Sequence, residues 1–149
     1  MLLSTLLARF NDWRFGRVDP NARPGPRGEQ TAARFLRRRG YTVIAESESD
    51  FAGEIDLICT NRSRSLMIFV EVKTLETTKP GHPADRVDDA KQARVTRAAL
   101  RYLTRRKMLN CRVRFDVIAI WWPKGLSEPK KIEHYQSAFD ATGVDGFYS

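Results

Sequence analysis

The stretch Leu66-Met67-Ile68-Phe69-Val70-Glu71-Val72-Lys73 ends an apolar run with two charged residues. Its first five residues lack polar alternation, which predicts a strand that is covered on both faces and central in its sheet. Side chains alternate between the faces of a strand, so Glu71 and Lys73 project to one side and Val70 and Val72 to the other. The pattern therefore places a carboxylate beside an ammonium group within a buried strand.

A second acidic residue interrupts the preceding apolar stretch, Glu54-Ile55-Asp56-Leu57-Ile58. The polar run at residues 61–65 has the length of a hairpin turn, so strands 54–60 and 66–72 are expected to pair and to bring Asp56 near Glu71. Two half-buried carboxylates repel each other, and a divalent cation offsets the cost of ionising them. Hard oxygen ligands of this kind suit Mg²⁺ or Mn²⁺.

The same residues also allow a purely structural interpretation. Glu71 and Lys73 could form a buried ion pair while Asp56 accepts a hydrogen bond in a turn. Buried pairs stabilise a fold less than apolar residues of equal volume, so keeping one in a central strand needs another reason. In the metal-site interpretation, Lys73 could stabilise the charge on an attacked phosphate or orient the attacking water. A single Glu-x-Lys pattern leaves both interpretations open.

Helices are predicted on both sides of this group of strands. A narrow apolar stripe predicts a helix over residues 28–39, and a strand follows at residues 41–45. After the central hairpin and a long loop, Asp85 is expected to cap a helix that runs to about residue 107. Residues 113–122 form a further apolar strand, and the tail from Ile132 could pair or pack at an edge. The order αβββαβ predicts an α/β fold with a mixed sheet and helices on its faces.

Residues 1–26 are expected to be an extension and linker in front of a single domain at residues 27–149. A helix over the first residues would carry its apolar side chains on one face, at Leu2, Leu3, Leu6, Leu7 and Phe10. We expect this helix to pack or fray at the terminus, with weak docking to a membrane or partner as the alternative. The Pro- and Gly-containing segment at residues 16–28 reads as the linker.

The overall composition favours a polyanionic partner. The 149 residues include 26 Lys and Arg against 18 Asp and Glu, which gives a formal charge of +8 and a pI near 9.9. Phosphate contacts by such a surface release condensed counterions, and DNA, RNA, acidic lipid and acidic protein would all fit. Two cysteines are too few for a disulfide framework and indicate reduced thiols in a cytoplasmic protein. No apolar stretch is long enough for membrane insertion.

The second predicted helix carries a basic stripe. Its members recur at spacings of three and four, at Lys91, Arg94, Arg97, Arg101 and Arg105. Such a stripe is usually a solvated surface, but no acidic residue lies between positions 91 and 107 to pair with it. We therefore expect contacts to nucleic-acid phosphates, without base readout.

Several short motifs follow one another along the chain. They are Gly28-Glu29, Gly53-Glu54-Ile55-Asp56-Leu57-Ile58, Phe69-Val70-Glu71-Val72-Lys73, Lys91-Gln92, Arg114-Phe115-Asp116-Val117, Ile132-Glu133-His134 and Ala138-Phe139-Asp140. This set resembles the bacterial YraN-like family over about residues 27–141. That family is similar to a branch of the PD-(D/E)XK nuclease superfamily, nearest in fold to Holliday-junction resolvases. The resemblance implies a restriction-endonuclease-like, resolvase-like fold, and because resolvase-like relatives are dimers it also allows a homodimer.

The resemblance also implies roles at matching positions. Asp56 corresponds to the superfamily's first metal carboxylate, and Glu71 with Lys73 corresponds to its Glu-x-Lys pair. Glu29 corresponds to an additional acidic residue at the metal, although a Glu at a helix start also suits the helix dipole. Gln92 corresponds to a polar helical residue beside the site, and is otherwise a solvated side chain.

The chain departs from the superfamily pattern in two places, and a further acid, Asp116, also needs a role. Ile55 stands where the superfamily has Pro before the first Asp, as it does in the YraN-like family. The acidic segment at residues 46–50 would repel a phosphate backbone on that side. Asp116 could be a third carboxylate near the metal, but a hydrogen-bonded structural role is favoured. No role is predicted for His82 or His134.

Three functions follow from these observations. The leading hypothesis is a Mg²⁺- or Mn²⁺-dependent endonuclease that cuts DNA phosphodiesters, with branched or flapped DNA as one substrate class. The alternative is a non-catalytic nucleic-acid-binding module that keeps the nuclease fold. A third hypothesis is a docking protein that engages a membrane-associated or acidic partner through its terminal helix and basic surface.

Overall fold

The computed structural model describes residues 1–51, 53–76 and 87–142. Its elements, in chain order, are α1 (Leu2–Phe15), α2 (Pro24–Arg38), β1 (Thr42–Asp50), β2 (Gly53–Thr60), β3 (Leu66–Leu75), α3 (Asp89–Arg105), β4 (Arg112–Trp121) and β5 (Lys131–Phe139). No helix among these residues is long and apolar enough to cross a bilayer.

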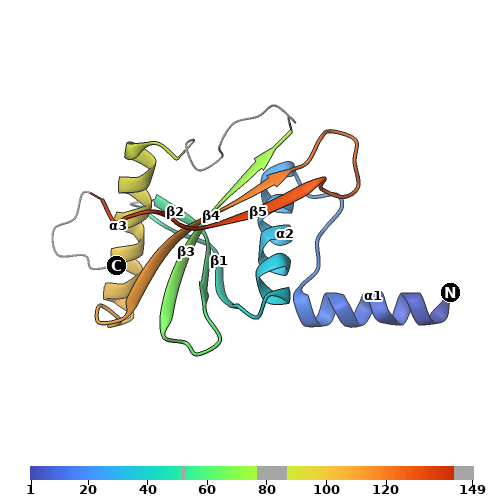
Figure 1. Cartoon of the computed structure of the whole chain (residues 1–149), viewed down its shortest axis with the longest axis horizontal. Coiled ribbons are helices and arrows are strands. Elements are labelled where there is room, and N and C mark those ends of the chain that lie inside the picture. The colour runs from blue at the N-terminus through green and yellow to red at the C-terminus, as the bar shows by residue number, and fades with distance from the viewer. Residues whose placement is uncertain (52, 77–86, 143–149) are drawn as a thin grey trace.

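The five strands form one mixed sheet in the order β1-β2-β3-β4-β5. β3 and β4 are parallel and are joined through α3, whereas every other neighbouring pair is antiparallel. Figure 1 shows the sheet nearly edge-on, with α3 against one face and α2 against the other. The predicted mixed α/β fold is confirmed, and the tail from Ile132 is the edge strand β5.

Each face of the sheet buries its own apolar cluster. On the α3 face, Phe69 and Phe115 stack on each other and pack with Val95, Ala99 and Leu103 of the helix. The α2 face buries a second set, made of Ala32, Ala33, Leu36, Leu57, Cys59, Ile68, Val70, Ile118, Ile120 and Trp122. The central strand β3 contributes to both clusters, which is why its apolar run shows no alternation.

The helix α2 begins earlier than the pattern predicted. It starts at Pro24 instead of Gly28, and it takes in the Pro26 that was assigned to the linker. The first residues of a helix have no intrahelical acceptor for their N–H groups, so Pro is tolerated in the first turn. The connection between α1 and α2 is therefore shorter than expected.

The terminal helix α1 forms, but its packing differs from the prediction. None of its residues is buried, and Leu3, Leu6 and Phe10 are exposed. The helix is attached at its C-terminal end, where Arg34 of α2 binds Asp12 at 2.7 Å and the Gly16 carbonyl oxygen at 2.6 Å. In Figure 1 the helix extends away from the sheet and its two covering helices. Its apolar residues are therefore not part of the domain's core.

Two further boundaries differ from the sequence prediction. β1 continues through the acidic segment to Asp50, so these acids belong to a strand and not to a loop. The N-cap of α3 is Asp88, whose side chain accepts a hydrogen bond from the Lys91 N–H at 2.8 Å. The expected cap, Asp85, and the loop residue His82 lie outside the described residues.

Candidate metal and nucleic-acid site

The site begins where the β2–β3 ladder opens. The paired register runs from Thr60↔Met67 to Leu57↔Val70 and does not extend to Asp56. At that point the Asp56 side chain enters the gap between the strands, and its Oδ2 accepts a hydrogen bond from the Val72 N–H at 2.7 Å. The carboxylate thus takes a backbone donor that a continued ladder would have used, and it lies beside Glu71.

Glu71 is the most deeply buried acid of the predicted site. Its side chain is 4% exposed, and its Oε1 lies 3.3 Å from Lys73 Nζ and 3.1 Å from Lys91 Nζ. Its Oε2 is also buried and has no hydrogen-bond partner within the described part of the chain. A buried carboxylate oxygen without a partner is costly, and it is a position that a bound cation or water would satisfy.

Close packing of α2 on β3 brings Glu29 to the same place. A Cβ on Gly28 would lie 1.9 Å from Thr74 Oγ1, so only glycine lets the first turns of α2 approach the strand this closely. The next residue, Glu29, accepts a hydrogen bond on Oε2 from the Ser47 hydroxyl at 2.9 Å. One carboxylate oxygen each from Glu29, Glu54 and Asp56 lies within 4.8 Å of the other two.

Glu54 was not assigned a role from the sequence. It lies two residues before Asp56 in the same strand, so the period of two in a β-strand was the signal that could have identified it. Its side chain is exposed at the mouth of the cluster. Glu54 thus adds a fourth carboxylate beside Glu29, Asp56 and Glu71.

Two acids of the cluster, Asp56 and Glu29, have raised pKa values. The pKa of Asp56 is raised to about 7. Burial is the largest cause, and the neighbouring charge of Glu71 acts in the same direction, whereas the hydrogen bond from the Val72 N–H lowers the pKa. Burial likewise raises the pKa of Glu29, although its hydrogen bond with Ser47 opposes the change. A divalent cation would reverse this cost, so the donor set fits Mg²⁺ or Mn²⁺.

Both interpretations of the Glu71–Lys73 pattern find support in this geometry. The ion pair between Glu71 and Lys73 exists, and a second ammonium group, from Lys91, shares the same carboxylate oxygen. Asp56 also accepts a hydrogen bond, although its donor is the Val72 N–H of the neighbouring strand and not a group in a turn. These contacts leave Glu71 Oε2 without a geometric hydrogen-bond partner among the described residues, and the pKa of Asp56 stays raised by burial and by its interaction with Glu71.

The predicted residues of α3 differ in their contacts, and only some of them reach the carboxylate cluster. Gln92 uses its side-chain amide to donate to the Val87 carbonyl oxygen at 2.8 Å, which fastens the start of the helix. Lys91 contacts Glu71 and so lies beside the carboxylate cluster as well as in the basic stripe. Arg94 and Arg97 are exposed and make no ion pair within residues 1–51, 53–76 and 87–142.

The helix supplies no acidic partner to its own basic stripe, as its sequence indicated, but β1 supplies two. Asp50 of β1 accepts from Arg101 Nε at 2.7 Å and from Arg105 Nη1 at 2.9 Å, and Glu48 lies 3.3 Å from Arg105 Nη2. These partners come from another element, about 50 residues away in the sequence. The acids of β1 are therefore largely neutralised by arginines, and the repulsion predicted for a phosphate on that side is reduced.

Asp116 lies on the opposite face of the sheet from Glu71. It is fully buried and binds Arg114 through two hydrogen bonds of 2.8 Å, His134 Nε2 at 2.7 Å and the Ser137 N–H at 3.0 Å. Burial alone would raise its pKa, but these hydrogen bonds hold the pKa below its ordinary value. Its role is the structural one that was favoured, since it ties β4 to the edge strand β5.

Comparison with known proteins places the chain in a family. Residues 28–120 match the family described as Uncharacterised protein family UPF0102. The chain belongs to this family. It is the YraN-like family that the motifs indicated, and its matched region holds Glu29, Glu54, Asp56, Glu71 and Lys73.

Individual UPF0102 proteins are similar over most of their length. The UPF0102 protein RB9115 of Rhodopirellula baltica is 63% identical over 139 residues, which cover 93% of this chain and 83% of that protein. The UPF0102 protein GSU0650 of Geobacter sulfurreducens is 40% identical over 116 residues, covering 78% of this chain and 88% of that protein. A UPF0102 protein of Trichlorobacter lovleyi is 38% identical over 120 residues, covering 80% and 92%. The helix α1 lies before the region that matches the family.

Proposed function

We propose that this protein is a Mg²⁺- or Mn²⁺-dependent endonuclease that hydrolyses DNA phosphodiesters. The observation that supports it most is the buried Glu71 oxygen, which has no hydrogen-bond partner among the described residues and lies beside Asp56, a carboxyl group with a raised pKa in a cluster with Glu29 and Glu54. The resemblance of the motifs to the PD-(D/E)XK superfamily assigns the same residues. Oxygen ligands for a metal ion and a nearby ammonium group are together suited to hydrolysis of a phosphodiester.

The residues divide into ligands and charge-stabilising groups. Asp56, Glu71 and Glu29 would hold the cation, which when bound polarises the phosphate and lowers the pKa of its water. Lys73 lies at the exposed side of Glu71, where its ammonium group can turn from the carboxylate to a phosphate oxygen and stabilise the charge that develops there. Lys91 can do the same from the start of α3.

The basic surface of α3 would hold the DNA backbone. Arg94 and Arg97 are exposed, without acidic partners in the described residues, and lie one and two turns after Lys91 on the same helix. Contacts of this kind position a duplex without reading its sequence. The substrate would thus be selected by its shape, as for branched or flapped DNA.

The test is cleavage of a panel of duplex, branched and single-stranded DNAs with Mg²⁺ or Mn²⁺. Asp56→Asn and Lys73→Ala should each lose metal-dependent cleavage, while duplex binding in EDTA and thermal melting at pH 6, below the pKa of Asp56, remain close to those of the wild type. Arg112→Ala, an exposed substitution at the opposite end of the β3–β4 pair, is the matched control and should cleave normally. Cleavage by the purified Asp56→Asn/Lys73→Ala double variant at the wild-type rate would rule out the proposed site.

A second function is supported by the two ammonium groups on Glu71. Lys73 and Lys91 neutralise one of its oxygens without a metal, as expected for a nucleic-acid-binding module that keeps the nuclease fold. Titration with Mn²⁺ separates the two functions, because a metal that binds only the folded state raises its melting temperature. Salt-sensitive DNA binding with no Mn²⁺ stabilisation and no cleavage would favour the binding module.

A further inference from the structure

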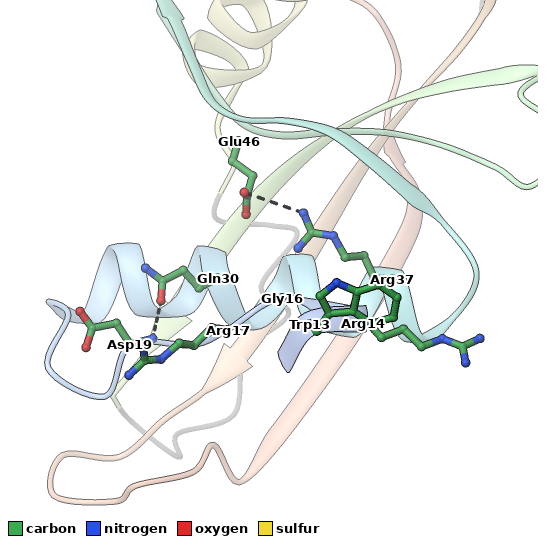
Figure 2. Close-up of a pocket in the computed structure, with 8 residues that line it drawn as sticks. All are labelled: Trp13, Arg14, Gly16, Arg17, Asp19, Gln30, Arg37 and Glu46. Carbon is green, nitrogen blue, oxygen red and sulfur yellow. Dashed lines mark hydrogen bonds and ion pairs between the residues drawn. The ribbon is translucent and has the colours of Figure 1, made fainter. Parts of the chain in front are cut away.

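A pocket lies between α1 and α2, and we call it the α1–α2 pocket. It has a volume of about 660 Å³ and is lined by Trp13, Arg14, Gly16, Arg17, Asp19, Gln30, Arg37 and Glu46. Figure 2 shows these side chains coming from the end of α1, the following connection, α2 and β1. Part of its wall lies before residue 28, outside the region that matches the family.

The chemistry of the α1–α2 pocket suits a phosphate chain with an exposed base. Three arginines and two acids, Asp19 and Glu46, line the pocket, so its side chains carry a net positive charge. Glu46 is already engaged, since its Oε2 lies 3.8 Å from Arg37 Nη2, whereas Arg14 and Arg17 make no ion pair among the described residues. Trp13 is 80% exposed and its ring contacts that of Phe10 at a centroid distance of 5.8 Å, so most of the indole surface is open to a stacking base. Arginines beside an open aromatic ring are the usual elements of single-strand binding.

The α1–α2 pocket and the candidate metal site share two elements, α2 and β1. Gln30 follows Glu29 on α2, and Glu46 precedes the residue that donates a hydrogen bond to Glu29, Ser47. The other end of the pocket is at Arg37, whose side chain donates to the Phe15 carbonyl oxygen beside Trp13. Seven residues of helix separate Gln30 from Arg37, about 10 Å at 1.5 Å per residue.

We propose that the α1–α2 pocket binds an unpaired nucleic-acid strand that leaves the candidate metal site. Arg17, at the Gln30 end, would contact the first phosphates, and Trp13 would stack on a base near Arg37. The strand must be unpaired because bases within a duplex present no free face to an indole ring. This inference rests on the proposed function, and it makes a duplex with a single-stranded tail the preferred substrate.

The test measures binding of fluorescein-labelled DNA by anisotropy in EDTA, so that no cleavage occurs. One probe is a blunt duplex, and two others carry the same duplex with a 5′ or a 3′ single-stranded tail. Wild-type protein should bind one tailed probe more tightly than the blunt one. Trp13→Ala should weaken binding of that tailed probe at least about fivefold, the lower range for loss of one base stack, and leave the blunt duplex unchanged. Arg17→Ala should act in the same direction.

Control variants separate the pocket from general basicity. Trp13→Phe keeps a stacking ring and should retain most of the preference, whereas Arg112→Ala removes an exposed arginine far from the pocket and should change neither probe. The exposed Trp13 also supplies a direct signal, because the tailed probe should quench tryptophan emission in the wild type and not in Trp13→Phe. Equal losses on both probes, no preference for a tail, or a change of oligomeric state in Trp13→Ala would each overturn the proposal.

The two proposals fail separately. Asp56→Asn should lose cleavage and keep the tail preference, while Trp13→Ala should keep metal-dependent cleavage of the blunt duplex. Absence of cleavage by the wild type with an intact tail preference would reject the endonuclease and retain the pocket. Metal-dependent cleavage by a wild-type protein that shows no tail preference would retain the endonuclease and reject the pocket.

Discussion

Asp56 links the candidate site to stability through protonation. Its pKa of about 7 lies above the ordinary value of 3.8, so between these values the folded protein holds a proton that the unfolded chain has released. The free energy of unfolding of the metal-free protein should therefore decrease as pH rises from about 4 to about 7. The contribution is on the order of a few kcal/mol, since one pKa unit corresponds to about 1.4 kcal/mol. Asp56→Asn has no carboxyl group at this position, so its free energy of unfolding should depend less on pH.

Urea denaturation in EDTA at several pH values measures this difference directly. Mn²⁺ competes with the proton, so the stability that it adds should be larger at pH 8 than at pH 6 in the wild type and small at both in Asp56→Asn. Parallel curves for the two proteins would contradict the assigned pKa of Asp56. Glu29, whose pKa is also raised, contributes a smaller slope of the same sign to both curves.

Gly28 sets the position of Glu29 by allowing α2 to touch β3. Gly28→Ala places a methyl group against Thr74 Oγ1, so the helix or the threonine must move. We expect a loss of about 1–3 kcal/mol in the free energy of unfolding, as for other overpacked sites, and a weaker Mn²⁺ stabilisation. Thr74→Ala removes the contacted oxygen and should restore part of both quantities in the double variant. Gly25→Ala is the control on the same helix, because nothing lies within 4 Å of its added Cβ.

At the level of elements, α3 divides its basic residues between two tasks. Arg101 and Arg105 fasten the helix to β1 through Asp50, whereas Arg94 and Arg97 are open to a ligand. Alanine at Arg101 and Arg105 should lower the free energy of unfolding by roughly 1 kcal/mol, because these pairs are partly exposed. Alanine at Arg94 and Arg97 should leave stability within about 0.5 kcal/mol and weaken DNA binding more strongly. Chemical denaturation and anisotropy on the same four variants check this division, and equal binding losses for both pairs would contradict it.

For the whole molecule, the charge of +8 predicts that DNA binding depends steeply on salt. Each phosphate contact contributes about 0.9 to the slope of log K against log salt concentration. The Arg94→Ala/Arg97→Ala variant should therefore reduce the slope by about 2 if each arginine contacts one phosphate. Anisotropy titrations of a blunt duplex over a range of salt concentrations give this slope. An unchanged slope would show that the duplex binds elsewhere on the basic surface.

The hairpin and its charged residues could be predicted from the sequence because their geometry is local. Alternation along a strand placed Glu71 and Lys73 together, and a short turn brought Asp56 beside them. The mixed sheet and the UPF0102 family followed from the order of elements and motifs. Glu54 was within reach of the same alternation and was missed because its side chain is exposed.

What depends on contacts between distant elements could not be predicted in this way. The ion pairs of Asp50 with Arg101 and Arg105, the second ammonium group on Glu71 and the exposure of α1 all arise from how helices pack on the sheet. The central strands β2 and β3, their acids and the family could be inferred from the sequence alone, because side-chain direction within a strand follows from backbone geometry. Only the tertiary structure decided which arginines are neutralised and where the α1–α2 pocket lies, because those distances depend on the packing of whole elements.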